Sequence, residues 1–272
     1  MLVSIVTPSL NGIEYLAECI ESTRSQATRN VEVEHVFVDG GSTDGTVEFA
    51  ASQGCTVLTR EESSIYFALN KGARNSKGTL LGRLGCDDVF LPGALDSVVQ
   101  HYERTGARWL VGGCRWMDQR GASRGDLRAP PSWLSAPMHA SLGWSCFSDL
   151  STFLHRDFYF QLAGYDDSFM YCGDYDLYAR ALQSEPFARL NRIVTGVRRH
   201  GDNMSMSADP KRLAEERAVA ERYGPQSEWQ QTAYRYLLKF WLNGTNPKWF
   251  LSKRIDGSRA RPHRSVIDRL AP

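Results

Sequence analysis

Strand-like and helix-like segments alternate along residues 1–115 of this 272-residue chain. Apolar runs of strand length cover residues 2–7, 33–38, 55–59, 79–84 and 109–114. Segments with the apolar spacing of a helix separate them, at residues 14–25, 46–52, 65–76 and 92–104. This alternation predicts an α/β fold of the Rossmann-like kind, with a mainly parallel sheet and helices on both faces.

Three aspartates follow two of the predicted strands. Asp39 comes directly after the run Val33–Val38, and Asp87 and Asp88 follow the run that ends at Leu84. Ligands of open α/β sheets bind at the carboxyl ends of the strands, and Mg²⁺ reaches proteins through one or two carboxylates plus substrate phosphates. We therefore predict a site for a divalent metal and a nucleotide here. The alternatives are a loop cap for the first aspartate and solvated loop acids for the other two.

Charge and cysteine content exclude several classes of protein. The net charge of +1 argues against a nucleic-acid partner. Six cysteines are spread along the chain without a C-x-x-C pair, which argues against a disulfide framework or a zinc site. No secretory signal opens the sequence, and no apolar stretch reaches the about 20 residues of a membrane span. We expect a cytoplasmic protein with reduced, mostly buried thiols.

The second half of the chain is less regular. Residues 120–138 contain two glycines and three prolines and predict one long loop. Residues 153–162 and 175–182 look helical in part, and residues 211–222 predict an amphipathic helix. The tail at 250–272 carries six Lys or Arg against two Asp, so it could lie on the inner face of an anionic membrane. Packing against the rest of the chain, or contact with a second copy, is an equal alternative.

Four short motifs occur in a fixed order within residues 1–205. They are Ser4–Asn11, the segment VDGGSTDGT at Val38–Thr46, Cys86-Asp87-Asp88, and GDYDL at Gly173–Leu177. Together they resemble the motifs of family 2 glycosyltransferases, inverting enzymes of the GT-A fold. The resemblance implies a nucleotide-sugar donor, Mn²⁺ or Mg²⁺ as cofactor, and transfer to an acceptor hydroxyl.

The resemblance also assigns roles to individual residues. The nucleotide-binding residues would be Thr7, Pro8, Asp39, Asn70, Lys71 and Asp87. The metal ligands would be Asp88, Asp87 and His200. Asp174 would be the catalytic base, in a motif where the family often places Glu at the position of Gly173. A helix cap is the alternative role for the predicted base, and a solvated loop side chain is the alternative for His200.

The motifs also suggest how the chain is divided. We expect a GT-A domain at 1–225, with a nucleotide-binding half at 1–115 and an acceptor half at 116–225. Residues 226–272 would form a helical, aromatic and basic C-terminal extension.

The predicted function is inverting transfer of a sugar, with a UDP-sugar as the first choice of donor by family frequency. The acceptor would be a carbohydrate or a lipid-linked molecule in surface polysaccharide or glycolipid synthesis. One alternative is a nucleotidyltransferase of related fold, against which the lack of Lys or Arg between Thr7 and Arg24 counts. The other is a non-catalytic nucleotide-sugar binding protein, against which the intact Asp87, Asp88 and Asp174 count.

Overall fold

One central sheet organises the computed structural model, which describes residues 1–59, 64–200 and 209–247. Within these residues the sheet has nine strands, in the order β3-β2-β1-β4-β8-β6-β9-β5 with β7 paired to β6. Their bounds are β1 (Leu2–Ser9), β2 (Glu32–Asp39), β3 (Thr56–Thr59), β4 (Leu80–Arg83), β5 (Val89–Phe90), β6 (Trp109–Met117), β7 (Ser123–Leu127), β8 (Thr152–His155) and β9 (Ala188–Arg198).

The sheet is parallel where the strand–helix alternation predicts it and mixed elsewhere. β3, β2, β1 and β4 all run parallel, so their carboxyl ends meet at one edge. β8 enters antiparallel to both β4 and β6, and β9 then runs parallel to β6. The predicted α/β class is confirmed, and the antiparallel pairs of β8, β7 and β5 are confined to the second part of the sheet.

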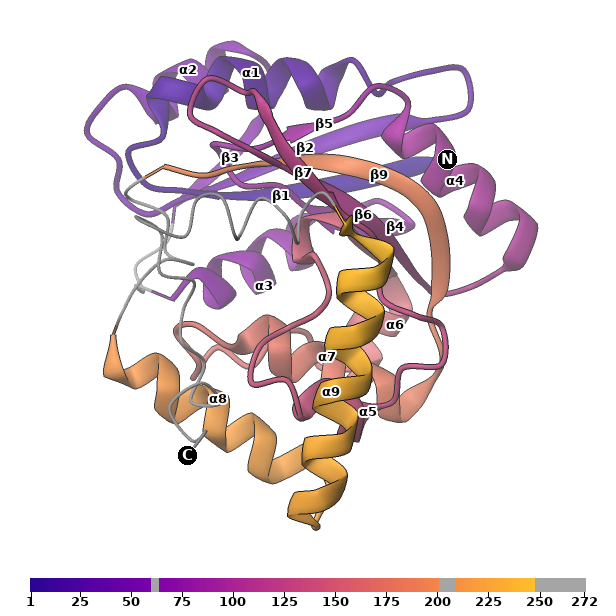
Figure 1. Cartoon of the computed structure of the whole chain (residues 1–272). Helices are drawn as coiled ribbons and strands as arrows, with labels where there is room; N and C mark the ends of the chain where they lie inside the picture. The colour runs from indigo at the N-terminus through magenta and orange to yellow at the C-terminus, as the bar shows by residue number, and fades with distance from the viewer. Residues whose placement is uncertain (60–63, 201–208, 248–272) are drawn as a thin grey trace.

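Helices cover both faces of the sheet (Figure 1). One face is covered by α1 (Ile13–Arg24), α2 (Thr46–Ser52) and α4 (Ala94–Thr105), and the other by α3 (Ile65–Asn75), α6 (Arg156–Gln161) and α7 (Gly173–Ser184). Along β1, Val3 and Ile5 pack into the core under α4, whereas Val6 packs into the core with α3 and α7. Both faces of the strand are therefore apolar, as a strand covered on both sides requires. All six cysteines lie within the described residues and are unpaired, and four of them are buried, as predicted.

Three segments of the second half differ from the sequence prediction. The long loop predicted at 120–138 contains β7, which forms a hairpin with β6, and α5 (Ala136–Ala140). The segment predicted as partly helical at 153–162 divides into β8 and α6. The strand β9 was not predicted, because polar residues interrupt its apolar run. The helix predicted at 211–222 is α8 (Pro210–Tyr223).

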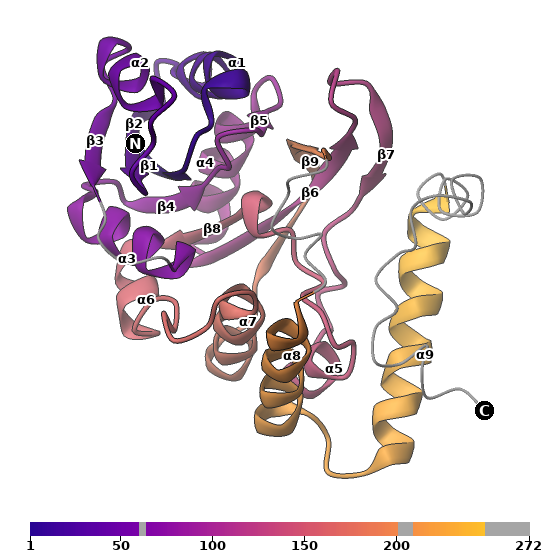
Figure 2. The ribbon, with the colours of Figure 1, turned by 90° about the vertical axis from the view of Figure 1, so that its left-hand side faces the viewer.

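The last described helix, α9 (Glu228–Thr245), lies at the outside of the molecule beyond α5 and α8 (Figure 2). It buries Leu238 and Leu242 against the domain, while its outer face exposes Trp229 by 71%, Tyr236 by 68% and Phe240 by 82%. None of the described helices is long and apolar enough to cross a membrane. Residues 248–272 of the predicted extension lie outside the described residues, and the predicted domain boundaries stay a prediction.

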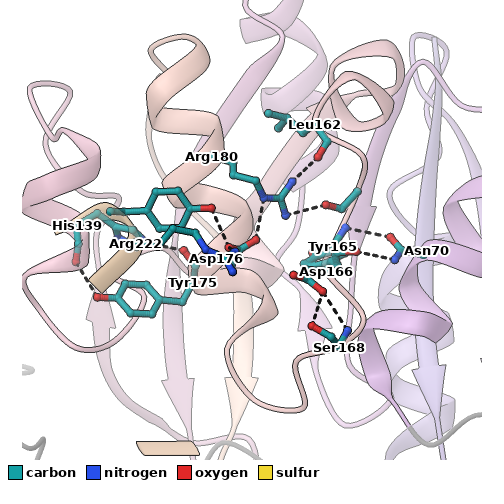
Figure 3. A network of polar contacts seen from close by, with 12 residues as sticks. Asn70, His139, Leu162, Tyr165, Asp166, Ser168, Tyr175, Asp176, Arg180 and Arg222 are labelled. Atoms are coloured by element: carbon teal, nitrogen blue, oxygen red, sulfur yellow. Dashed lines mark hydrogen bonds and ion pairs between the residues drawn. The ribbon is translucent and has the colours of Figure 1, made fainter. Parts of the chain in front are cut away.

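Asp176 connects α7 to α8 through a buried polar network (Figure 3). Its Oδ2 accepts a hydrogen bond from Arg180 Nε at 2.7 Å, and its Oδ1 accepts from Tyr223 Oη at 2.9 Å and Arg222 Nη1 at 3.1 Å. Asp176 is 0% exposed. The network therefore fixes the first turn of the helix that carries Asp174.

We expect Asp176→Ala to lower the free energy of unfolding by about 2 kcal/mol, because it leaves the buried Tyr223 hydroxyl and the partly buried Arg180 guanidinium without their acceptor. Urea unfolding of the full chain measures this change. Asp167→Ala, at an exposed neighbouring aspartate, is the control and should change stability by less than about 0.5 kcal/mol. Equal losses in the two variants would contradict a structural role for this network.

Candidate active site

The loop after β4 brings the carboxylates of Asp87 and Asp88 to one side of Gly85. A Cβ placed on Gly85 would lie 2.4 Å from Asp88 Oδ2 and 2.7 Å from Asp87 Oδ1, so only glycine leaves room for the pair. Asp88 is 5% exposed. Burial and the neighbouring Asp87 charge raise the pKa of Asp88 well above its usual range. The pair is therefore an electrostatically costly arrangement that a cation would relieve.

The carboxyl end of β9 closes over this acidic pair. The Arg198 backbone N–H donates to Asp88 Oδ1 at 2.8 Å, and Arg198 Nε donates to the Asp87 carbonyl at 2.9 Å. His200 Nε2 lies 2.8 Å from Asp87 Oδ2, and the His200 ring stacks on Tyr15 with the centroids 5.6 Å apart. Of the three residues predicted as metal ligands, the structure thus brings His200 into contact with Asp87, although His200 lies 113 positions later in the sequence.

Asp39 lies at the end of β2, directly opposite Ser9 at the end of β1. Its Oδ2 accepts hydrogen bonds from the backbone N–H groups of Gly41 at 2.7 Å and Ser42 at 2.8 Å. Its Oδ1 accepts from the Ser42 hydroxyl at 2.5 Å and the Ser9 hydroxyl at 3.1 Å. Burial raises the pKa of Asp39, but these bonds outweigh burial and hold the pKa below its usual value. Asp39 therefore caps the following loop, and a nucleotide contact would replace one of these bonds.

Asp174 lies in the first turn of α7 and is partly buried. The Tyr66 hydroxyl donates a hydrogen bond to its Oδ1 at 3.2 Å. Burial and the charge of Asp149 raise the pKa of Asp174 to about 6, while the Arg83 charge and the Tyr66 bond oppose the rise. A carboxyl group with this pKa is ionised at neutral pH yet basic enough to accept a proton.

Arg83 connects the acidic pair with Asp174. It is the last residue of β4, and its charge lowers the pKa of both Asp88 and Asp174. Asp149 holds it, with Oδ2 accepting from Arg83 Nη1 at 2.5 Å, and Asp149 also accepts from the Tyr165 hydroxyl at 2.9 Å. Neither residue of this ion pair was predicted from the sequence. The only signal for Arg83 was a charge at the end of an apolar run, and none marked Asp149.

The model of the family described as "Glycosyl transferase family 2" matches residues 4–161, which is more than half of the chain. The chain belongs to this family. An uncharacterized glycosyltransferase from Rickettsia prowazekii is 31% identical over 65% of this chain and 57% of its own length. Chondroitin synthase from Escherichia coli is 25% identical over 75% of this chain and 30% of its own length. This family 2 chain thus spans about half, or less, of the length of these curated relatives.

Solved structures show the same fold. TarS 1–349 from S. aureus, in complex with UDP-GlcNAc, has a TM-score of 0.65 and 15% identity over 94% of this chain and 83% of its own. The mannosyltransferase PcManGT from Pyrobaculum calidifontis, in complex with GDP-Man and Mn²⁺, has a TM-score of 0.58 and 14% identity over 98% of this chain and 78% of its own. The predicted GT-A glycosyltransferase fold is confirmed.

The acidic pair of this family 2 chain has the chemistry that a divalent metal requires. Within the part of the chain that the structure describes, no three His, Cys, Asp or Glu side chains gather as a preformed metal cage. Mg²⁺ needs none, because one or two carboxylates and the substrate phosphates hold it. The partly exposed Asp87 and the buried Asp88 supply such carboxylates, and the imidazole of His200 favours Mn²⁺. The residues present therefore fit a divalent ion.

Asn70 holds the turn that precedes α7 (Figure 3). Its Oδ1 accepts from the Tyr165 backbone N–H at 3.0 Å, and its Nδ2 donates to the Tyr165 carbonyl at 2.8 Å. Arg180 donates to the Gly164 carbonyl at 2.9 Å and also to the Leu162 carbonyl. Asn70 therefore has structural partners for both ends of its amide, and its predicted nucleotide contact stays a prediction.

The other predicted nucleotide-binding residues also have partners within the protein. The Thr7 hydroxyl bonds to His35 Nε2 at 2.9 Å, and Pro8 lies buried in β1 opposite Val38. Lys71 Nζ donates to the carbonyl of Thr59, the last residue of β3, at 2.5 Å. These contacts place all three side chains in or beside the sheet, and their predicted roles in nucleotide binding stay predictions.

Proposed function

We propose that this protein is an inverting glycosyltransferase that moves a sugar from a nucleotide-diphosphate donor to an acceptor hydroxyl. The observation that carries the proposal is the position of Asp174. Its partly buried carboxyl has a pKa of about 6 and lies near Arg83, whose charge also acts on the acidic pair. The shared influence of Arg83 supports a base near the place where the family motifs expect the donor diphosphate.

The chemistry of inverting transfer requires one base and no nucleophilic carboxylate. In the proposed mechanism Asp174 removes the proton from the acceptor hydroxyl, and the acceptor oxygen attacks the sugar carbon that bears the diphosphate. Asp87, Asp88 and His200 would hold Mg²⁺ or Mn²⁺. When bound, that ion supplies Lewis-acid stabilisation of the charge on the diphosphate leaving group.

The donor and acceptor are proposed from relatives and structural neighbours. A UDP-sugar is our first choice, supported by the UDP-GlcNAc complex of TarS, and a GDP-sugar is the second, because the mannosyltransferase is described with GDP-Man. The chondroitin synthase relative supports a carbohydrate acceptor in polysaccharide synthesis, and a lipid-linked acceptor stays open. Membership of the glycosyltransferase family counts against the alternative of a nucleotidyltransferase. Measured turnover is what would distinguish an active enzyme from a nucleotide-sugar binding protein without activity.

Asp174→Asn should lower turnover by about 10²- to 10⁴-fold, because the amide cannot accept the proton, while nucleotide binding stays unchanged. Release of nucleoside diphosphate from UDP-, GDP-, dTDP- and CDP-sugars measures turnover. In the unmodified protein, kcat/KM should rise with pH, reach half of its maximum near pH 6 and level off above about pH 7, since only ionised Asp174 acts as base. Asp167→Asn, in the neighbouring exposed turn, is the control. Equal turnover in both variants would contradict the role of Asp174.

We further propose that the C-terminal extension contacts an anionic membrane surface. The outer face of α9 forms a continuous uncharged stripe of exposed residues at helical spacing, namely Trp229, Ala233, Tyr236, Leu237 and Phe240. Exposed apolar patches of this kind mark interaction sites. The sequence that follows carries six basic residues against two acidic ones at 250–272, which complements anionic lipid better than a second copy of the same basic tail.

The full chain should sediment with vesicles of phosphatidylcholine and phosphatidylglycerol but not with vesicles of phosphatidylcholine alone. Replacing Trp229 and Phe240 by Ser should abolish sedimentation, because it removes the two most exposed aromatic side chains of the stripe. Phe160→Ser, at an aromatic residue that is 39% exposed on α6, is the matched control. Equal sedimentation of the protein with both kinds of vesicle would contradict the lipid proposal. So would a dimer of the unmodified chain that becomes a monomer in the double variant.

A further inference from the structure

The aromatic ring of Tyr66 occupies the space next to the residue that precedes the proposed base. A Cβ placed on Gly173 would lie 2.7 Å from Cγ and Cδ2 of the Tyr66 ring, which is closer than real Cβ atoms approach other atoms. Tyr66 is 4% exposed, so its ring has little freedom to move aside. A side chain at position 173 would therefore overlap with the aromatic ring at position 66, and glycine at 173 avoids this overlap.

Packing fixes the direction of the Tyr66 hydroxyl. On another side the ring stacks on Tyr165, with the centroids 5.3 Å apart. The hydroxyl donates to Asp174 Oδ1 at 3.2 Å, from α3 to the first turn of α7. A side chain 108 positions earlier in the sequence thus holds the carboxyl of the proposed base.

We propose that Tyr66 is a positioning residue for the Asp174 base, and that Gly173 is required because it admits the Tyr66 ring. The proposal rests on the proposed function, since it assigns a role within that site. The family motif often places a Glu where this chain has Gly173, and here the tyrosine ring fills that place. The hydroxyl orients the carboxyl and favours its ionised form, while the proton from the acceptor goes to Asp174 and not to Tyr66.

Charged and titratable groups from several elements face Asp174. They determine in which direction the pKa of Asp174 changes when the Tyr66 hydroxyl is removed. Asp149, from the turn before β8, raises the pKa of Asp174, and Arg83, from β4, lowers it. The adjacent Cys172 thiol is neutral, because burial and the Asp174 charge raise its pKa. The hydrogen bond from Tyr66 also lowers the pKa of Asp174. Removing the hydroxyl alone should therefore raise that pKa further.

Tyr66→Phe keeps the ring against Gly173 and removes only the hydroxyl. Titration of protein labelled with ¹³C at the aspartate carboxyl carbons, followed by NMR, should show the pKa of Asp174 shifted upward by roughly one pH unit. Asp174→Asn identifies the signal. Gly173→Ala is a second variant: it forces the ring and the start of α7 apart, which lengthens the hydroxyl–carboxylate bond, and it should shift the pKa in the same direction. Tyr159→Phe removes a buried hydroxyl that bonds Asn70 instead, and should leave the signal unchanged.

An unchanged pKa in Tyr66→Phe, or an equal shift in Tyr159→Phe, would overturn the proposal. The titration needs no substrate, so its outcome is independent of whether the chain transfers a sugar. Where turnover is measured, the acid limb of kcat/KM in Tyr66→Phe should move upward by the same amount as the titration. A variant that lowers kcat without moving this limb would show a merely structural role for Tyr66.

Discussion

The repulsion between Asp87 and Asp88 is the constraint on which the site depends. Two carboxylates that are largely removed from water need compensation from elsewhere. Arg198 supplies part of it through its backbone N–H to Asp88, and His200 contacts Asp87. These partners come from the end of β9, so the pairing of β9 with β5 and β6 completes a site that β4 begins. The remaining repulsion suits a bound cation.

The two halves of the chain meet at Arg83. Its charge lowers the pKa of both Asp88 and Asp174, and Asp149 fixes its position. The proposed base Asp174 lies in the first turn of α7, which the hydrogen bonds of the buried Asp176 fix in place. A donor at the acidic pair and an acceptor at the base would thus share one rigid framework.

The first half of the fold could be predicted from the sequence because its strands are unbroken apolar runs between well-formed helices. The acidic pair was recognisable because it follows one of those runs. The strand β9 was not, since Asn191 and Arg192 interrupt its pattern while tertiary pairing with β6 supplies its stability. The contacts of Asp149 and Tyr66 could not be predicted from the sequence, because only the folded chain brings these residues to Arg83 and Asp174.

Calorimetric titration of the full chain with UDP, GDP, dTDP and CDP, each with and without Mn²⁺, tests the central claim most directly. We expect one of these nucleotides to bind in the presence of Mn²⁺ and much more weakly in its absence. Asp88→Asn should remove that difference, because it removes one charge of the acidic pair. No binding of any nucleotide by the folded protein, or binding that Mn²⁺ does not change, would contradict the account.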